Sequence, residues 1–219
     1  MVVFFNWFLK ITAFLPYWLV FRPKYYYENK KVQSRRIKKG AIVISNHHSV
    51  WDFAVTLFTF PFRNLRCAAA EILFERNIFL KLFLKSLGAV KVDRRDHNFS
   101  FLSNLEREVR KNRVVEIYPE SRIPRPEEST PLEFKPSAVY LALRTGAPII
   151  PICNNAKYFS KSRVRVIIGE PIYVQSLYDE NLTERENIVI INDIIRGKII
   201  EFQRQLESYE KKEKEEKGI

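Results

Sequence analysis

Short apolar runs alternate along the chain with longer segments in which apolar residues recur at helical spacing. The runs, which are typical of buried strands, lie at 41–44, 66–70, 89–92, 114–118, 149–152 and 163–168. The helical segments lie at 51–58, 72–87, 99–111, 137–145 and 183–218. This alternation predicts an α/β fold, with a mixed, largely parallel sheet flanked by helices. The last segment turns into Glu and Lys repeats, so we expect its end to be a frayed, solvated helix.

Residues 2–21 form an almost wholly apolar, aromatic-rich opening. A helix of this length just reaches across a hydrocarbon core of about 30 Å, but a central Lys such as Lys10 costs about 2.5 to 3.5 kcal/mol on insertion. Pro16 also removes a backbone donor. No basic region precedes the segment and no cleavage site follows it, which argues against a signal peptide. We predict a retained, membrane-associating helical segment that lies in the interface rather than spanning it.

Positive charge follows this opening directly. The chain has 37 Lys and Arg against 25 Asp and Glu, a formal net charge of +12. A basic strip with interleaved tyrosines contains Arg22, Lys24, Lys30, Lys31, Arg35, Arg36, Lys38 and Lys39. Each cation near an anionic leaflet contributes about 1 kcal/mol, so we expect the strip to hold the protein against the cytoplasmic face of a membrane. A solvated loop and a surface for single-stranded nucleic acid are the alternatives, and the apolar opening makes nucleic acid the less economical one.

Residues 1–39 are therefore predicted to be a membrane-anchoring apolar segment with its polybasic strip. Residues 40–219 are predicted to be one catalytic domain with a charged helical tail. A chain of 219 residues can bury a sizeable core, and its 46% hydrophobic content is too high for a disordered protein.

The strongest candidate for chemistry is the sequence Asn-His-His-Ser-Val-Trp-Asp at 46–52, directly after an apolar run. His47 and Asp52 are five residues apart, so they would diverge by roughly 140 degrees on one regular helix. We therefore place His47 in a loop and Asp52 in the first turn of the next helix, where the carboxylate orients the imidazole as a general base. The alternative is ordinary helix capping, by Asn46 or Ser49, with Asp52 at the helix dipole.

Three further blocks follow, at 88–94, 116–122 and 146–152. Together, the four blocks resemble the glycerolipid acyltransferase family, typified by 1-acyl-glycerol-3-phosphate (lysophosphatidic acid) acyltransferase, over roughly residues 40–175. The matching residues are Asn46, His47 and Asp52 in the first block, Gly88 and Arg94 in the second, Tyr118, Pro119, Glu120 and Arg122 in the third, and Pro148 and Pro151 in the fourth. The chain departs from the family pattern at Ser121, where glycine is usual, at Arg122, which comes one residue early, and at 135–138, where a common glycine is missing. These departures bear on the identity of the acceptor.

The resemblance implies an O-acyltransferase of phospholipid biosynthesis. It would move a fatty acyl group from an acyl-coenzyme A or acyl carrier protein thioester to the free hydroxyl of a lysophosphatidic acid-like acceptor at a membrane surface. In this reading His47 is the base and Asp52 orients it. The acceptor contacts expected from the family are Arg94 at the phosphate, with Ser121 and Arg122 as weaker phosphate ligands, Glu120 at acceptor hydroxyls, and Pro151 in the acyl-binding wall.

Each of these contacts has a structural alternative. Arg94 could form a surface ion pair with Asp93 or Asp96, and Glu120 could pair with a neighbouring Arg. The sequence lacks zinc-site spacing and nucleotide-binding loops, so we expect neither a metal nor a permanently bound cofactor. The rival functions are acylation of another acceptor, such as glycerol 3-phosphate, another lysophospholipid or a hydroxylated lipid, and a non-catalytic basic protein that binds membranes or nucleic acid.

Overall fold

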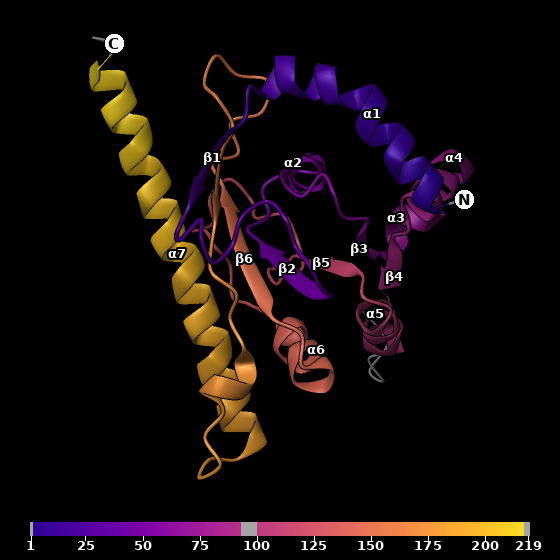
Figure 1. Cartoon of the computed structure of the whole chain (residues 1–219), viewed down its shortest axis with the longest axis vertical. Coiled ribbons are helices and arrows are strands. Elements are labelled where there is room, and N and C mark those ends of the chain that lie inside the picture. The colour runs from indigo at the N-terminus through magenta and orange to yellow at the C-terminus, as the bar shows by residue number, and fades with distance from the viewer. Residues whose placement is uncertain (1, 93–99, 217–219) are drawn as a thin grey trace.

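The computed structural model describes residues 2–92 and 100–216 and contains a mixed, largely parallel sheet between layers of helices (Figure 1). The strand order is β1-β7-β6-β2-β5-β3-β4, and only the β6–β7 pair among the described strands is antiparallel. The strands are β1 (Lys24–Tyr27), β2 (Ala41–Ser45), β3 (Leu65–Ala70), β4 (Val90–Val92), β5 (Val114–Ile117), β6 (Ile149–Asn154) and β7 (Arg165–Ile168). The predicted α/β fold is confirmed.

Helices cover both faces of the sheet. They are α1 (Val2–Phe21), α2 (Asp52–Thr59), α3 (Glu71–Glu75), α4 (Ile78–Leu87), α5 (Ser100–Arg110), α6 (Ser137–Thr145) and α7 (Glu184–Glu216), with a short 3₁₀ helix at Val174–Leu177. The central strand β2 is buried throughout, and its side chains alternate between two cores. Ile42 and Ile44 pack with α5, α6 and α7, whereas Ala41 and Val43 pack with α1 and α2.

The segment predicted as one helix at 72–87 is two helices. Asn77 separates α3 from α4, and its side-chain Oδ1 accepts the backbone N–H of Leu80 at 2.7 Å. An asparagine in this position offers the backbone a local partner, which ends one helix and begins the next. α4 then ends at Gly88, whose φ of +76° is a conformation that glycine adopts without strain.

Strand β1 lies within the basic strip that the sequence analysis assigned to a membrane appendage. It pairs in parallel with β7, from Lys24 beside Arg165 to Tyr27 beside Ile168. The strip is thus joined to the sheet through its tyrosine-rich part. The sequence pattern did not indicate this strand because a charged, aromatic edge strand lacks the apolar run of a central one.

Helix α7 lies within the helical segment predicted at 183–218, and much of it packs on the protein. Its apolar stripe, from Ile188 to Leu206, is buried against the sheet. Beyond that stripe, Glu210 and Glu213 reach Arg165 of β7, and the Glu213 carboxylate lies 2.6 Å from the guanidinium. Because Arg165 is itself buried, these contacts hold the Glu- and Lys-rich part of the helix on the protein as far as Glu213.

Candidate active site

The polar loop after β2 is tied to the neighbouring strand β6. Asn46 is fully buried, and its amide Nδ2 donates to the backbone carbonyl of Asn154 at 2.8 Å. Its Oδ1 accepts the backbone N–H of Asn154 at 3.0 Å. Since β2 and β6 are parallel neighbours, both contacts lie at the carboxyl end of the sheet, where open α/β sheets usually bind ligands. Asn46 therefore fixes the backbone at the point where the chain leaves the sheet, directly before His47.

Asp52 is the first residue of α2, and the loop bends so that its carboxylate meets His47. Its Oδ2 lies 2.9 Å from the imidazole Nδ1. The same oxygen accepts the backbone N–H groups of His48 at 2.7 Å and Ser49 at 2.8 Å. The contact expected from the sequence is present. Parts of the capping alternative are present too, because Ser49 Oγ accepts the backbone N–H of Trp51 at 3.3 Å and Asp52 lies in the first turn of α2, but His47 is in contact with Asp52 and is not a bystander.

The second carboxylate oxygen of Asp52 accepts hydrogen bonds from the end of β6 and from the segment that follows β6. Asn154 Nδ2 donates to Oδ1 at 3.3 Å, and the Tyr158 hydroxyl donates to the same atom. Burial by itself raises the pKa of this fully buried carboxyl group, but the hydrogen bonds from His47, Tyr158 and Ser49 outweigh it and hold the pKa below its usual value. Asp52 is therefore an ionised carboxylate at neutral pH, held by several donors.

His47 is oriented by this carboxylate and by an aromatic ring. An ionised Asp52 can only accept, so the imidazole carries its proton on Nδ1 and leaves Nε2 as the acceptor. The ring stacks on Tyr118 with centroids 4.2 Å apart and planes inclined by 19°. Its side chain is 18% exposed, whereas that of Asp52 is not exposed at all. The arrangement presents one basic nitrogen to an incoming substrate.

Glu120 braces the backbone of the same loop. Its Oε1 accepts the backbone N–H of His47 at 2.9 Å, and its Oε2 accepts the backbone N–H of Leu132 at 2.9 Å. The side chain is only 3% exposed, and this burial raises its pKa despite the two hydrogen bonds. The partners that the structure gives to Glu120 are backbone groups on two loops, in place of the Arg side chain expected as its structural alternative.

Glu116 accepts a hydrogen bond from Tyr118, the residue whose ring stacks on His47. The Tyr118 hydroxyl lies 2.7 Å from Glu116 Oε1, so the ring that stacks on His47 is held at its polar end. Glu116 is fully buried in β5, and burial raises its pKa to about 8. It is therefore protonated at neutral pH, and the carboxyl groups in contact with His47 are those of Asp52 and Glu120.

Ser121 and Arg122 lie on the surface beside Glu120. Ser121 has a φ of +59°, a left-handed conformation that glycine adopts without strain. Arg122 forms a two-pronged ion pair with Glu128, with both N–O distances at 2.6 Å. Its guanidinium is thus engaged by a carboxylate, and this contact would have to be exchanged if Arg122 were to bind a phosphate.

Pro151, the residue predicted in the acyl-binding wall, lies in the core of the protein. Pro151 is buried within β6 beside Ile44, on the side of the sheet that α7 covers. A Cβ atom at Gly169 would lie 2.7 Å from Pro151 Cγ and 2.8 Å from Phe202 of α7, so the proline is part of a close-packed core. Arg94 lies in 93–99, outside the described residues.

Sequence patterns indicated Tyr118 only as a motif match and gave no indication that Asn154 and Tyr158 belong to the site. Asn154 and Tyr158 are more than 100 positions from Asp52, so spacing gives no signal for them. The end of the apolar run at 149–152 was the available clue, because polar residues that follow adjacent parallel strands meet at one edge of the sheet. In the part of the chain that the structure describes, no group of three His, Cys, Asp or Glu side chains is placed to hold a metal ion.

Helix α1 packs on the protein with its polar side. Asn6 Nδ2 donates to the carbonyl of Leu87 at 3.0 Å, and Lys10 Nζ donates to the carbonyls of Pro61 at 3.0 Å and Arg63. These acceptors lie at or just beyond the ends of α4 and α2. The two side chains satisfy carbonyl groups that helix ends leave without partners. Lys10, which argued against a clean span, is thus turned inward and is only 5% exposed.

The opposite side of α1 is apolar and exposed. Its large exposed side chains are Val3, Phe4, Trp7, Phe8, Ile11, Phe14, Leu15, Trp18, Leu19 and Val20. Among the described helices, α1 is also the one whose length and composition would suit a bilayer. An apolar face of this extent on a helix that is anchored by its polar side suits contact with a membrane surface.

The carboxyl end of α1 adjoins the site. Phe21 is buried and makes edge-on contacts with Tyr158, at a centroid distance of 5.6 Å, and with Trp51, at 6.0 Å. Tyr158 in turn donates to Asp52. Trp51 and Phe159 are themselves exposed, so an apolar rim continues from the outer face of α1 to the loop that carries His47.

Residues 24–155 match the sequence model of the family described as Acyltransferase. The chain belongs to this family. The match begins at strand β1 and ends just after β6, so it spans His47, Asp52, Glu120 and the buried Asn46–Asn154 contact. The residues assembled at the sheet edge therefore lie within the matched range, apart from Tyr158, which lies beyond it.

Two relatives are 1-acyl-sn-glycerol-3-phosphate acyltransferases by name. The beta form from Homo sapiens is 28% identical over 174 residues, which are 73% of this chain and 62% of the human protein. This chain thus spans less than two thirds of that relative's length. The enzyme from Bacillus subtilis (strain 168) is 27% identical over 175 residues, covering 77% of this chain and 84% of the relative.

The crystal structure of the 1-acyl-sn-glycerophosphate (LPA) acyltransferase from Thermotoga maritima has a similar fold. It aligns with a TM-score of 0.64 over 94% of this chain and 78% of the other, at 16% sequence identity. At this identity the likeness establishes the architecture, including the mixed sheet with flanking helices.

Proposed function

We propose that the protein is an O-acyltransferase that moves a fatty acyl group from a thioester to the free hydroxyl of a lysophosphatidic acid-like acceptor, a step of phospholipid biosynthesis. The observation that carries the proposal is the 2.9 Å contact between His47 and the buried Asp52 at the carboxyl end of the sheet. Membership of the acyltransferase family supports a role in acyl transfer for this pair. The acceptor class is supported by the names of the human and Bacillus relatives.

In the proposed reaction, Nε2 of His47 takes the proton from the acceptor hydroxyl as that oxygen attacks the thioester carbonyl carbon. The C–S bond breaks as the new C–O ester bond forms, and the imidazolium returns its proton to the departing thiolate. Asp52 keeps the Nδ1 proton in place and stabilises the positive charge on the ring. Positioned base catalysis of this kind typically supplies about 10² to 10⁴ in rate.

Acceptor recognition would use the surface around Glu120. We propose Arg94 as the main ligand of the acceptor phosphate because a guanidinium fork matches that anion. Arg122 is the weaker choice, since it would have to exchange Glu128 for the phosphate. Ser121 is also a weaker choice, since its backbone N–H donates to the Tyr118 carbonyl at 2.9 Å and would have to exchange that partner for the phosphate. Glu120, which holds the His47 backbone, is proposed to position the base in addition to meeting acceptor hydroxyls, and Pro151 to support the acyl side from within the core.

The donor is proposed to be acyl-coenzyme A or acyl carrier protein, used as a co-substrate and not as a resident cofactor. Both are soluble, acidic or phosphorylated molecules of the cytoplasm, which suits a chain with a net charge of +12. The lysophospholipid acceptor is a membrane molecule. We therefore propose a peripheral or monotopic enzyme on the cytoplasmic face, with residues 1–39 supplying the attachment and residues 40–219 the catalytic domain.

Release of free thiol tests the reaction directly. Detergent-purified protein is mixed with lysophosphatidic acid and either acyl-coenzyme A or acyl carrier protein loaded with a fatty acid. We expect His47→Ala to reduce thiol release to near the uncatalysed level. The matched variant His48→Ala removes the neighbouring imidazole but keeps the backbone N–H to Asp52, so its loss should be far smaller. Equal losses in both variants would contradict the assignment of the base.

The acceptor is tested with a panel. Glycerol 3-phosphate, other lysophospholipids and a hydroxylated lipid without phosphate are compared with lysophosphatidic acid by kcat/KM. The proposal expects lysophosphatidic acid to lead. Preference for another acceptor would keep the His47 chemistry and replace the acceptor, whereas absence of transfer with any acceptor, together with steeply salt-dependent binding to DNA or RNA, would favour a non-catalytic basic protein.

Attachment through α1 needs a variant that spares the core. Removal of residues 1–21 would strip Tyr17 from its stacking contact with Phe58, at 4.3 Å between centroids, and would expose the interior. Substitution of the outer face, in the triple variant Phe8→Ser, Ile11→Ser and Leu15→Ser, leaves that contact intact. We expect this variant to lose vesicle binding and to keep its unfolding temperature in detergent. Full vesicle binding would contradict the attachment.

A further inference from the structure

A second apolar surface lies on α3 and α4, outside the site and outside α1. Phe79 is 80% exposed, Ile72 is 72% exposed, and Ile78, Leu82 and Phe83 are also exposed. Positions 79, 82 and 83 share one side of α4, because residues three and four apart lie on the same face of a helix. Large apolar side chains gathered on one face are unlike the scattered exposed hydrophobics of ordinary protein surfaces.

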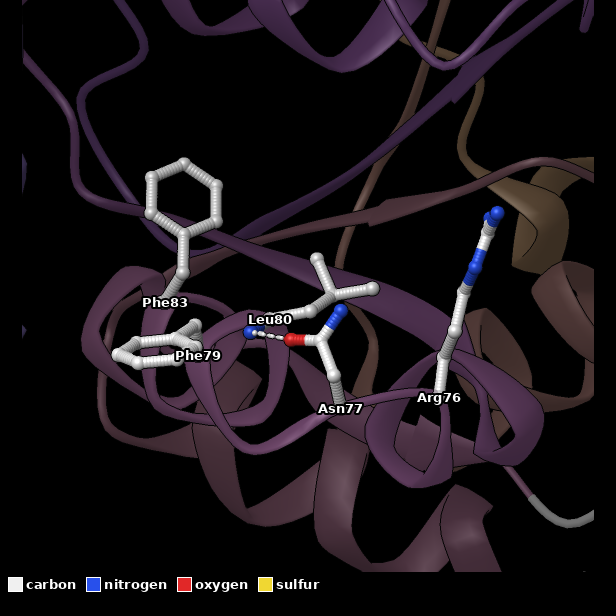
Figure 2. Close-up of a pocket in the computed structure, with 5 residues that line it drawn as sticks. All are labelled: Arg76, Asn77, Phe79, Leu80 and Phe83. Carbon is white, nitrogen blue, oxygen red and sulfur yellow. Dashed lines mark hydrogen bonds between the residues drawn. The ribbon is translucent and has the colours of Figure 1, made fainter.

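This surface is hollowed and edged by positive charge. A depression of about 500 Å³ is lined by Arg76, Asn77, Phe79, Leu80 and Phe83. Figure 2 shows the Phe79 and Phe83 rings on one side of the hollow and the extended Arg76 side chain on the other. Lys81 and Lys85, also on α4, are exposed as well, and the nearby exposed Glu75 is an opposing charge. The exposed charges of 75–85 are thus mainly cations.

The surface on α4 is continuous with the outer face of α1. The Phe5 and Phe83 rings meet edge-on with centroids 5.9 Å apart. Asn6 fastens α1 to the carboxyl end of α4 through the Leu87 carbonyl. The amino-terminal half of α1 lies alongside α4, while its carboxyl end runs past α2 (Figure 1). Phe4 and Phe8 stack on α1 close to this junction and extend the apolar surface across it.

We propose that the exposed face of α3 and α4, centred on Phe79 and Leu82, is a second membrane-docking element that enters the headgroup region of an anionic bilayer beside α1. Its apolar side chains would meet the upper acyl chains. Arg76, Lys81 and Lys85 would remain at the level of the lipid phosphates, because long basic side chains bury their stems and keep their charge in the polar zone. The inference rests on the proposed function only for the attachment through α1.

Two contact regions fix an orientation, whereas one helix leaves the protein free to rotate about its axis. With α1 and α4 both in the surface, the exposed Trp51 and Phe159 beside His47 are held at the membrane boundary. A lysophospholipid could then reach His47 along the apolar rim without crossing water. The proposal therefore assigns α4 to positioning the whole enzyme on its substrate layer.

A polarity-sensitive fluorophore placed on α4 tests contact with lipid. The full-length variants Phe79→Cys and Val189→Cys are labelled in parallel, with the unsubstituted protein as the baseline for the native cysteines; Val189 is an exposed apolar residue of α7. Vesicles of phosphatidylcholine and phosphatidylglycerol are then added. We expect a blue shift at position 79 and no change at position 189.

The other results of this experiment each decide a point. Vesicle binding without a shift at position 79 would overturn the inference and leave the α1 attachment standing. Absence of vesicle binding would overturn both. A blue shift at position 79 that needs no vesicles and grows with protein concentration would show that a second copy of the chain covers this face, which also overturns the proposal.

A paired variant measures the contribution to binding. Phe79→Ser with Leu82→Ser should weaken vesicle affinity by roughly tenfold, which corresponds to about 1.4 kcal/mol. The control, Val189→Ser with Ile190→Ser on α7, should bind as the unsubstituted protein does. Acyl transfer to a short-chain acceptor dispersed in solution should persist in both paired variants. A loss of acyl transfer that is confined to vesicle-bound acceptors then identifies a defect in docking and not in the reaction. Unchanged vesicle affinity in the α4 pair would contradict the proposal.

Discussion

The loop after β2 and the inner face of α1 both bury polar side chains. The loop exposes a polar, reactive ring, whereas α1 exposes an apolar surface. In the loop, donors converge on the carboxylate of Asp52 and leave the His47 ring partly accessible. On α1, backbone carbonyls converge on the ammonium group of Lys10, and the side of the helix that faces outward is apolar. One region keeps a charge inside so that a reactive nitrogen can face a substrate. The other keeps its polar groups inside so that an apolar surface can face lipid.

This difference predicts which property each buried polar group controls. A change at Asp52 should affect rate and leave membrane binding alone, because its partners surround the proposed base. A change at Lys10 should affect stability and leave the chemistry alone, because its partners lie at and just beyond the carboxyl end of α2. A variant that affected both properties equally would show that the two regions are not separate.

The largest effect is expected for Asp52→Asn. An amide in this position can no longer stabilise the imidazolium and can hold the ring in the wrong tautomer, so we expect kcat to fall by about 10³ to 10⁴, or about 4 to 5.5 kcal/mol. The fall is measured by thiol release in detergent, and vesicle binding should be unchanged. Asp193→Asn, at an exposed position on α7, is the matched control. A loss below tenfold would contradict the assigned role of Asp52.

A smaller effect, on stability, is expected at Glu116. Its pKa is raised by burial from 4.5 to about 8, so the folded protein holds this proton more tightly than the unfolded chain does. Its contribution to stability is full below the unfolded pKa and is lost as pH rises through the folded one. Glu116→Gln removes the titration. Between about pH 5.5 and about pH 7.5, the unsubstituted protein should lose about 2 to 3 kcal/mol relative to this variant.

Denaturant unfolding in detergent at both pH values measures this difference. The exposed substitution Glu133→Gln is the control and should leave the pH dependence as it is. Parallel pH curves for Glu116→Gln and the unsubstituted protein would refute the protonated state of Glu116.

Lys10→Met tests the polar attachment of α1. The substitution keeps an unbranched side chain but leaves buried carbonyls without their donor, which should lower the free energy of unfolding by about 2 kcal/mol. Thermal unfolding in detergent measures the loss, and the exposed Lys39→Met serves as control. Vesicle binding should persist because the outer face is unaltered. If binding vanished while stability held, the division between inner and outer faces of α1 would be wrong.

The smallest effect is expected at Ser121, on the rim of the site. A φ of +59° costs a residue with a Cβ about 1 to 2 kcal/mol, so Ser121→Gly should raise stability by about 0.5 to 1 kcal/mol after the greater chain entropy of glycine is included. Ser103→Gly, in the exposed middle of α5, should lower stability by about 0.5 kcal/mol. Equal signs for the two changes would contradict the strain at Ser121.

The sequence predicted much of the fold because periodicity reports burial locally. The runs at 41–44 and 149–152 lie in β2 and β6, and the helical segment at 137–145 coincides with α6. The pairing of His47 with Asp52 was also predictable, because the short loop that carries His47 leads directly into α2, whose first residue is Asp52. The break at Asn77 was not predicted, since the apolar pattern continues unchanged across it.

Contacts between distant segments were beyond the reach of sequence patterns. Tyr158 reaches Asp52 across 106 positions, and β1 joins the sheet by pairing with β7. Neither contact has a local signature, because tyrosines and lysines serve equally well on a solvated strip, at a membrane surface or on an edge strand. The separate clues at 149–155 and 24–27 acquire meaning only when the neighbouring strands are known.

By itself the sequence determined the alternation of strands and helices, the loop that carries His47 and Asp52, and an apolar opening with one lysine in its middle. These features depend on neighbours within a few residues, where backbone geometry dictates which side chains meet. Only the tertiary structure decided that Lys10 turns inward, that Tyr158 and Asn154 complete the shell around Asp52, and that α4 extends the apolar surface of α1. Each of those outcomes depends on which segments pack together, and packing is set by the whole core.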